Sequence, residues 1–265
     1  MVRIKTKTTG VFCEKGFKLP VNYRKDAKVL LVGLGGLGCP TALMLTRAGI
    51  GELRVLDDDV VEASNLHRQI LFSQDDVGKD KLVAGVAALR RLCPDSPTRF
   101  EPIQSRLLPD NARELVRDVD IVVEGSDNFA TKFLCADTCF LEKKPVVQGA
   151  AVRWITTALS TDPGGRPCYR CLFEDLPAQD QAPNCAEAGV LGSVVGFGAA
   201  LMVELTLRVV HGCPDYGHVY SYDGRLDRLR RHKLFSRDNC ALCGHQPEIV
   251  GIGWSAYMGE NCESP

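Results

Sequence analysis

A group of charged and polar residues follows a short apolar stretch near residue 55. The segments LDDDVVEASNLHRQ and VGKDK supply Asp57, Asn65, Arg68, Lys79 and Lys81. A dehydrogenase has little use for cations near its ribose-binding acid, because it only holds a dinucleotide and directs the nicotinamide. Breaking a triphosphate does need fixed cations, since negative charge builds up on the phosphoryl oxygens in the transition state. These residue types therefore indicate chemistry at nucleotide phosphates.

A second polar group, GSDN, places Asp127 and Asn128 directly after the apolar stretch 119–126. In an open parallel sheet, ligands bind outside the carboxyl ends of the strands. A carboxylate at such a position can hold Mg²⁺. Each of these residues taken alone is as readily a solvated surface charge. Their joint occurrence at strand ends favours a single site.

The glycines of GLGGLG lie between an apolar run and a helical pattern. Gly33, Gly35 and Gly38 fit the G-x-G-x-x-G spacing, and the acid Asp57 ends the next strand. Such glycines permit a tight turn and close approach of the backbone to phosphate, while the acid can bond a ribose hydroxyl. The motif indicates a nucleotide without distinguishing NAD from ATP.

Two cysteine pairs have the spacing of metal knuckles: Cys168 with Cys171, and Cys240 with Cys243. Two C-x-x-C pairs supply the four thiolates of a closed zinc site. Redox dithiols or chance remain open at this point, because the two pairs are much farther apart than in a zinc ribbon. Two further cysteines, Cys135 and Cys139, lie one helical turn apart, where burial explains them best.

The chain pattern alternates between strands and helices up to about residue 150. Strands are predicted at 27–34, 51–57, 98–105, 119–126 and 144–152, with helices at about 39–49, 79–92, 110–117 and 127–141. That order is typical of a Rossmann-like, doubly wound α/β fold with a mainly parallel sheet. Beyond it, antiparallel strands are predicted around one long helix at about 193–211. We therefore expect a β-rich C-terminal portion appended to the sheet and stapled by metal.

Composition limits the alternatives. The net charge of −1 gives no general attraction to nucleic acid or to an anionic membrane. No apolar signal-peptide core is present in residues 1–26, and the longest apolar stretch, 189–203, is too short to span a bilayer. We expect that stretch to be a buried helix, and we expect a cytoplasmic protein that binds neither nucleic acid nor membrane.

Taken together, these motifs resemble the ThiF/MoeB/HesA family of adenylyltransferases, relatives of ubiquitin-activating enzymes. The resemblance runs from about residue 27 to 243 and rests on VLLVGLGGLG, SNLHRQ with its downstream lysine, EGSDNFATK, KPVVQGAAVR, CYRCLF and NCAEAGVLGSVVG. It implies a single adenylation domain over 1–265, with a nucleotide-binding half at 1–150 and a β-rich, zinc-binding half at 151–265. It also implies that Gly36 and Asp57 bind ATP and that Asn65, Arg68 and Lys81 surround its phosphates. By the same resemblance, Asp127 holds Mg²⁺ and the four paired cysteines hold structural Zn²⁺.

The implied substrate is a ubiquitin-like sulfur carrier protein that ends in Gly-Gly. Its carboxylate would be adenylated and later converted to a thiocarboxylate for thiamine, molybdopterin, tRNA-thiolation or related sulfur metabolism. Because few residues follow Cys243, we expect a separate sulfur donor of the cysteine desulfurase or rhodanese type. We also expect a homodimer, although the N-terminal sequence departs from the family's usual R-Y-x-R-Q helix. In the family, an arginine of this helix reaches the nucleotide of the neighbouring subunit, and Arg3 or Arg24 is the candidate for this role here.

One cysteine raises a separate question. Cys185 lies in the segment 177–192, which is rich in small, polar and proline residues and resembles a mobile loop over the active site. A thiolate there could attack the acyl-adenylate or exchange with a persulfide. In a chain with 12 cysteines, simple packing is an equal alternative.

Two other functions stay open at the level of sequence. A catalytically impaired relative that serves as a binding partner fits the altered N-terminus, and a NAD(P)-dependent oxidoreductase fits the glycine motif alone. The basic run 228–233 is expected to be a solvated strand rather than a docking site.

Overall fold

A computed structural model describes residues 26–176 and 189–257. Its strands form one sheet in the order β3-β2-β1-β4-β5-β6-β7-β8. The first five in that order pair in parallel, and they are β3 (Arg99–Gln104), β2 (Glu52–Asp57), β1 (Lys28–Val32), β4 (Ile121–Glu124) and β5 (Val146–Val152). An antiparallel extension adds β6 (Ile155–Thr161), β7 (His218–Asp223) and β8 (Arg228–Lys233). The predicted fold class is confirmed.

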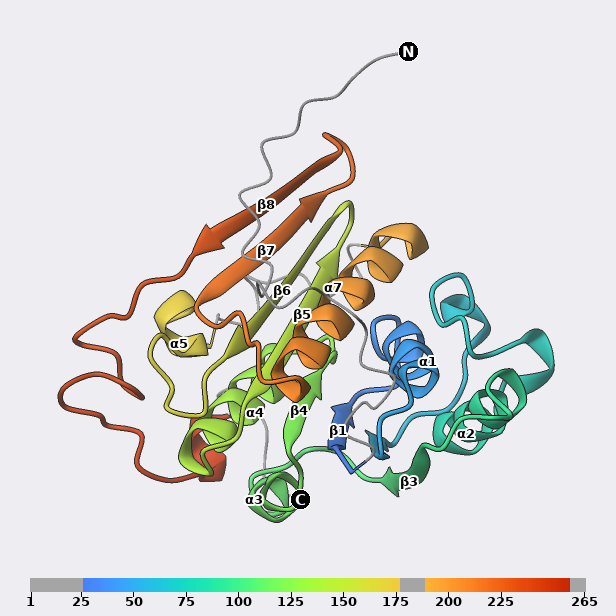
Figure 1. Cartoon of the computed structure of the whole chain (residues 1–265), viewed down its shortest axis with the longest axis horizontal. Helices are drawn as coiled ribbons and strands as arrows, with labels where there is room; N and C mark the ends of the chain where they lie inside the picture. The colour runs from blue at the N-terminus through green and yellow to red at the C-terminus, as the bar shows by residue number, and fades with distance from the viewer. Residues whose placement is uncertain (1–25, 177–188, 258–265) are drawn as a thin grey trace.

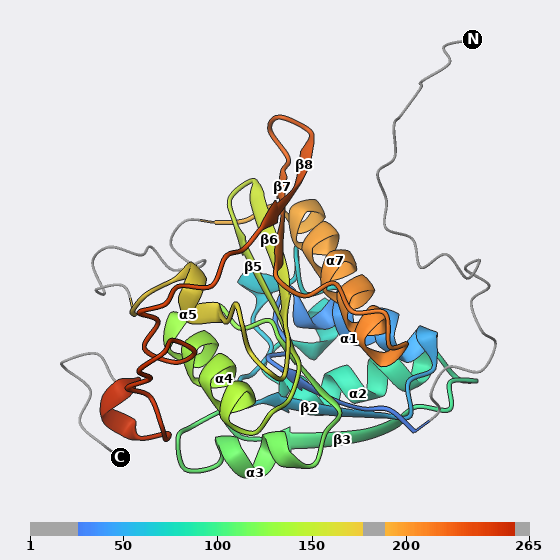
Figure 2. The same cartoon turned by 60° about the vertical axis from the view of Figure 1, so that its left-hand side comes forward.

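Helices cover both faces of the sheet (Figures 1 and 2). On one face lie α1 (Gly38–Ala48), α2 (Lys81–Leu92) and α7 (Gly192–Val210). The other face carries α3 (Ala112–Arg117), α4 (Phe129–Leu141) and the short α5 (Tyr169–Leu172). Short 3₁₀ turns occur at η1 (Ala63–Asn65), η2 (Gln74–Asp76) and η3 (Trp254–Ala256).

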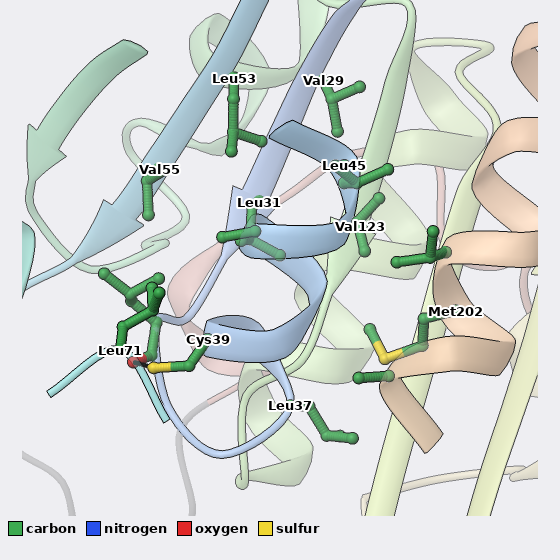
Figure 3. Packing of buried hydrophobic residues seen from close by; sticks show 14 of the residues in the cluster. Val29, Leu31, Leu37, Cys39, Leu45, Leu53, Val55, Leu71, Val123 and Met202 are labelled. Carbon is green, nitrogen blue, oxygen red and sulfur yellow. Dashed lines mark hydrogen bonds between the residues drawn. The ribbon is translucent and has the colours of Figure 1, made fainter. Parts of the chain in front are cut away.

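The apolar run in β1 explains why this strand is central. Alternate residues of a strand point to opposite faces, so Val29 and Leu31 pack under α1 while Leu30 and Val32 pack toward α4. All four are at most 3% exposed. Figure 3 shows Val29 and Leu31 near α1, with Val123 of β4 between them and Met202 of α7. A strand buried on both faces needs such a continuous apolar sequence.

The long helix α7 belongs to this core. It is longer than the apolar stretch 189–203 had indicated, and by length and composition alone it could cross a membrane. However, it packs against β5, β6 and α1, and half of its most apolar window is buried inside the protein (Figure 1). The prediction of a buried helix is therefore confirmed, although the argument from its short length was wrong.

The antiparallel end of the sheet is more exposed. Every residue of β8 is exposed, as expected for the basic run, and the β7–β8 hairpin projects beyond the helices (Figure 2). After β8, the C-terminal segment runs back to the face of the sheet that carries α3 and α4. There the indole Nε1 of Trp254 donates to Asp110 at 2.8 Å, and Tyr257 packs into the core beside α4.

Candidate nucleotide site and cysteine cluster

The carboxyl ends of β1, β2 and β4 meet at one pocket, beside the start of α1 and the turn before α4. The pocket holds about 1050 Å³ of space, part of it open to solvent. The predicted site residues that line it are Gly33, Gly35, Gly36, Asp57, Asn65, Arg68, Lys81, Asp127 and Asn128. These predicted residues therefore lie together around one pocket, while their roles toward a nucleotide stay predictions.

The glycine loop has the backbone that its motif requires. Gly33 has φ of 89°, in the region where a side chain is strained. Gly38 is not in the pocket wall, but a Cβ at this position would lie 1.9 Å from the Gly33 carbonyl oxygen. This third glycine thus allows the start of α1 to pack on the loop, and the first allows the turn itself.

Asp57 ties the glycine loop to the end of β2. Its carboxylate accepts the Leu34 N–H at 2.6 Å and the Asp59 N–H at 2.9 Å. The side chain is only 7% exposed, and burial raises the pKa of Asp57 against the opposing effect of the Lys81 ammonium. Asp57 consequently shapes the loop from within as well as presenting an acid to the pocket.

Lys81 stands at the first residue of α2 and is 6% exposed. Its Nζ donates to Asp59 at 2.7 Å and lies 4.0 Å from Asp57. The preceding residue, Asp80, caps the helix by accepting the N–H groups of Leu82 and Val83. The cap fixes where the helix begins, and so where this ammonium is presented.

Lys79 was expected in the same cluster, and the structure contradicts this. Its Nζ bonds Asp76 at 3.0 Å, its side chain is 55% exposed, and it is not among the residues that line the pocket. Lys79 lies two residues before the start of α2, and its side chain is exposed to solvent. The side chain of Lys81, in contrast, lines the pocket.

Arg68 and Asn65 reach the pocket from the turn that begins at η1. A Cβ added to Gly36 would lie 3.3 Å from the Arg68 Cδ, so the arginine stem lies against the glycine loop. The Asn65 amide donates to Glu62 at 3.0 Å. A guanidinium laid across a glycine loop is suited to bind phosphate oxygens.

The turn after β4 presents Asp127 and Asn128. Asp127 is exposed at the pocket. Asn128 is the N-cap of α4, and its side-chain oxygen accepts the Thr131 N–H at 2.8 Å. The cap occupies this oxygen, which leaves the amide N–H₂ of Asn128 to meet a ligand.

Sequence reasoning missed several residues in the pocket wall and directly behind it. Gln69 is 3% exposed, lines the pocket, and has a side-chain oxygen without a hydrogen-bond partner. Asp59 pairs with Lys81, and Glu124 forms a buried ion pair with Lys132 behind the Asp127 turn. Glu124 is a charged residue at the end of the apolar strand VDIVVE, and a buried charge needs a partner. This feature of the sequence could have identified it.

The four paired cysteines form a second, separate site. Their sulfurs all lie within 4.8 Å of one another and all four residues are buried. The sulfur of Cys168 is 3.5 Å from that of Cys240, and Cys171 is 3.4 Å from Cys243. Zinc–sulfur bonds of about 2.3 Å in a tetrahedron separate sulfurs by about 3.8 Å. The donor set and spacing therefore fit Zn²⁺.

Electrostatics within the cluster favour a thiolate at Cys243 and oppose one at Cys168 and Cys171, since the hydrogen bond to Cys243 raises the pKa of Cys168 and burial raises the pKa of Cys171. Hydrogen bonds from its partners, that from Cys168 foremost, lower the pKa of Cys243 to about 5. Cys135 and Cys139 lie in α4 outside this cluster and are fully buried, as predicted. Cys185, Arg3 and Arg24 lie outside the described residues.

Residues 17–243 match the ThiF family. The chain belongs to the ThiF family. It is 40% identical over 239 residues to "Adenylyltransferase and sulfurtransferase MOCS3" of Xenopus laevis, covering 89% of this chain and 52% of that protein. The protein of the same name from Danio rerio is 39% identical, with coverage of 86% and 50%. This chain thus spans about half the length of the curated relatives it matches.

Solved structures agree on the fold. A crystal structure of E. coli MccB with ATP has a TM-score of 0.72 at 23% identity, covering 83% of this chain and 67% of that one. MccB in complex with N-formylated MccA gives a TM-score of 0.74 at 24% identity, with coverage of 83% and 68%. At this level of identity the likeness extends to the architecture alone.

Proposed function

We propose that the chain is an ATP-dependent adenylyltransferase acting on the C-terminal glycine of a ubiquitin-like sulfur carrier protein. The observation that carries this proposal is the convergence of Arg68, Lys81 and Asp127 on a glycine-loop pocket. Membership of the ThiF family and the naming of its MOCS3 relatives as adenylyltransferases support it. The proposal treats 1–265 as one adenylation domain, with halves at 1–150 and 151–265.

In the proposed reaction, the carrier's carboxylate oxygen attacks the α-phosphorus of ATP. A bond forms between these two atoms, and the bond from the α-phosphorus to the bridging oxygen breaks. Pyrophosphate leaves with the electron pair of that bond. Arg68 and Lys81 stabilise the negative charge that develops on the phosphoryl oxygens, while the glycine loop allows close approach of the backbone.

Two metals belong to the proposal. Asp127 supplies an exposed carboxylate for Mg²⁺, which when bound would neutralise phosphate charge, and Asp57 lies in the same pocket wall. Zn²⁺ would be held by Cys168, Cys171, Cys240 and Cys243, linking α5 to the C-terminal segment. The zinc site lies apart from the residues lining the pocket, so its role is structural.

The proposed partners complete the assignment. We expect a Gly-Gly-ending carrier, a separate sulfur donor of the cysteine desulfurase or rhodanese type, and a homodimer, all in the cytoplasm. The acyl-adenylate would be the substrate for thiocarboxylate formation.

ATP–pyrophosphate exchange tests this proposal. The purified chain is mixed with Mg²⁺, labelled pyrophosphate and each small Gly-Gly-ending protein from the same genome. We expect exchange with one carrier and none when its terminal carboxylate is amidated. Absence of exchange with every carrier would favour the impaired relative, and copurified nicotinamide absorbance would favour the oxidoreductase.

A further inference from the structure

A buried ion pair lies directly behind the nucleotide pocket and has no part in the reaction described above. Glu124 is the last residue of β4 and its side chain is 0% exposed. Lys132 lies in the first turns of α4 and its side chain is 7% exposed. The Lys132 Nζ donates to the Glu124 Oε2 at 2.8 Å.

The two residues connect three elements around the pocket. The other carboxylate oxygen of Glu124 accepts the Ser126 N–H at 2.6 Å and also the Ser126 hydroxyl. The Lys132 Nζ donates in addition to the carbonyl oxygen of Gly149 in β5, at 2.6 Å. The ion pair therefore ties the turn after β4 to α4 and to the neighbouring strand.

The turn that is held in this way is the one that carries Asp127. Ser126 is fixed by Glu124, and Asn128 is fixed as the N-cap of α4. Asp127 lies between these two anchored residues, exposed at the pocket. The turn also packs on the glycine loop, since a Cβ added to Gly33 would lie 3.4 Å from the Ser126 nitrogen.

Stability is a poor explanation for such a pair. Desolvation of two buried charges offsets much of their attraction, so apolar residues of similar volume often stabilise a protein equally well. The same helix carries another buried pair farther along, in which Arg170 bonds both carboxylate oxygens of Asp137. That pair touches Tyr257 of the C-terminal segment and does not line the pocket.

We propose that Glu124 and Lys132 are positioning residues for Mg-ATP, which hold the turn 125–128 so that Asp127 and the backbone face the nucleotide phosphates. The inference rests on the proposed function only in taking a magnesium nucleotide as the ligand. Outer residues that orient a metal-binding carboxylate characteristically change metal affinity or activity when they are removed.

The experiment compares two matched double variants of the full chain by calorimetric titration with Mg-ATP, with no carrier present. Glu124→Leu/Lys132→Met removes the pair behind the pocket, and Asp137→Leu/Arg170→Met removes the other pair on the same helix. Neither variant leaves a buried unpaired charge. We expect the first to weaken Mg-ATP binding by roughly 10- to 100-fold and the second to leave the dissociation constant unchanged.

A mutant cycle with Asp127→Ala separates positioning from general damage. If the pair acts through the turn, adding Glu124→Leu/Lys132→Met to Asp127→Ala weakens binding far less than it does in the wild-type background. Equal weakening in the two backgrounds, or equal effects of the two double variants, would overturn the proposal. Should the first double variant not fold, Ser126→Ala removes only the hydroxyl contact to Glu124. Unchanged Mg-ATP affinity in that variant also overturns the proposal. The titration needs no carrier protein, so the two proposals can fail separately. A wild-type chain that binds Mg-ATP but does not catalyse exchange contradicts the proposed adenylation and leaves the positioning role intact.

Discussion

The ammonium of Lys81 lies 2.7 Å from the carboxylate of Asp59, where α2 begins and β2 has just ended. The two residues are 22 positions apart in the chain and meet at the pocket. Asp59 is 67% exposed, whereas Lys81 is 6% exposed. The third aspartate of LDDD thus pairs with a buried cation at the pocket wall.

Arg68→Ala tests the phosphate site most directly. One fixed donor to a developing charge contributes about 3 kcal/mol, so we expect ATP–pyrophosphate exchange to fall by about 100-fold or more. Lys79→Ala is the matched control, because Lys79 follows in the same segment but lies outside the pocket wall. Exchange at the wild-type rate in Arg68→Ala would show that this guanidinium does not act on the phosphates.

The glycine loop allows a test of its own packing. Gly38→Ala brings a Cβ to within 1.9 Å of the Gly33 carbonyl oxygen, so the backbone must shift and we expect a loss of several kcal/mol of unfolding free energy. Gly35→Ala meets nothing closer than 3.9 Å, and we expect its stability to stay near that of wild type. Chemical denaturation of the two variants measures both effects, and similar midpoints would contradict the packing argument.

We expect the stability of the folded protein to depend on pH through the turn at η2, shortly before Lys81. Hydrogen bonds from the Ser73 N–H, the Ser73 hydroxyl and Lys79 lower the pKa of Asp76 to about 2. A depressed folded pKa contributes stability above the unfolded pKa of about 4, and this contribution is lost as the pH falls toward 2. We therefore expect wild type to have a higher melting temperature than Asp76→Asn at pH 6. The difference between the two melting temperatures should narrow between about pH 4 and pH 2. A gap that stays constant across this range would exclude the carboxylate as its source.

The cysteine cluster predicts one zinc ion per chain. Metal binding is coupled to folding, so a strong chelator should lower the melting temperature, and Cys240→Ser should do the same. Cys93→Ser is the control, because Cys93 ends α2 and lies outside the cluster. Elemental analysis of freshly purified, reduced protein that finds no zinc would refute this prediction.

The role of Cys185 stays a prediction, since it lies outside the described residues. If its thiolate acts after adenylation, Cys185→Ser leaves ATP–pyrophosphate exchange intact and blocks thiocarboxylate formation in a reconstituted system with sulfur donor. An undiminished thiocarboxylate yield would leave Cys185 with a packing role. Loss of exchange itself would point to the fold or the ATP site.

The sequence alone predicted the mainly parallel sheet with its antiparallel extension, and it indicated that two cysteine pairs could meet at one metal. Doubly apolar runs such as 28–32 require a strand buried on both faces, and parallel strands bring their carboxyl ends to one edge. That rule predicts that Asp57 and Asp127, at the ends of two such strands, lie near one another, and the spacing of two C-x-x-C pairs suggests that the pairs meet.

Tertiary structure decided which partner each polar group takes. The residue types in VGKDK do not by themselves distinguish Lys79 from Lys81. In the structure, only Lys81, the first residue of the capped helix α2, lines the pocket. Glu124 accepts hydrogen bonds from Lys132 and Ser126, and Asp137 accepts one from Tyr257, which lies 120 residues away in the chain. Periodicity and motif spacing are local properties of a chain, whereas a buried charge selects its partner from whatever the packed elements bring within about 3 Å.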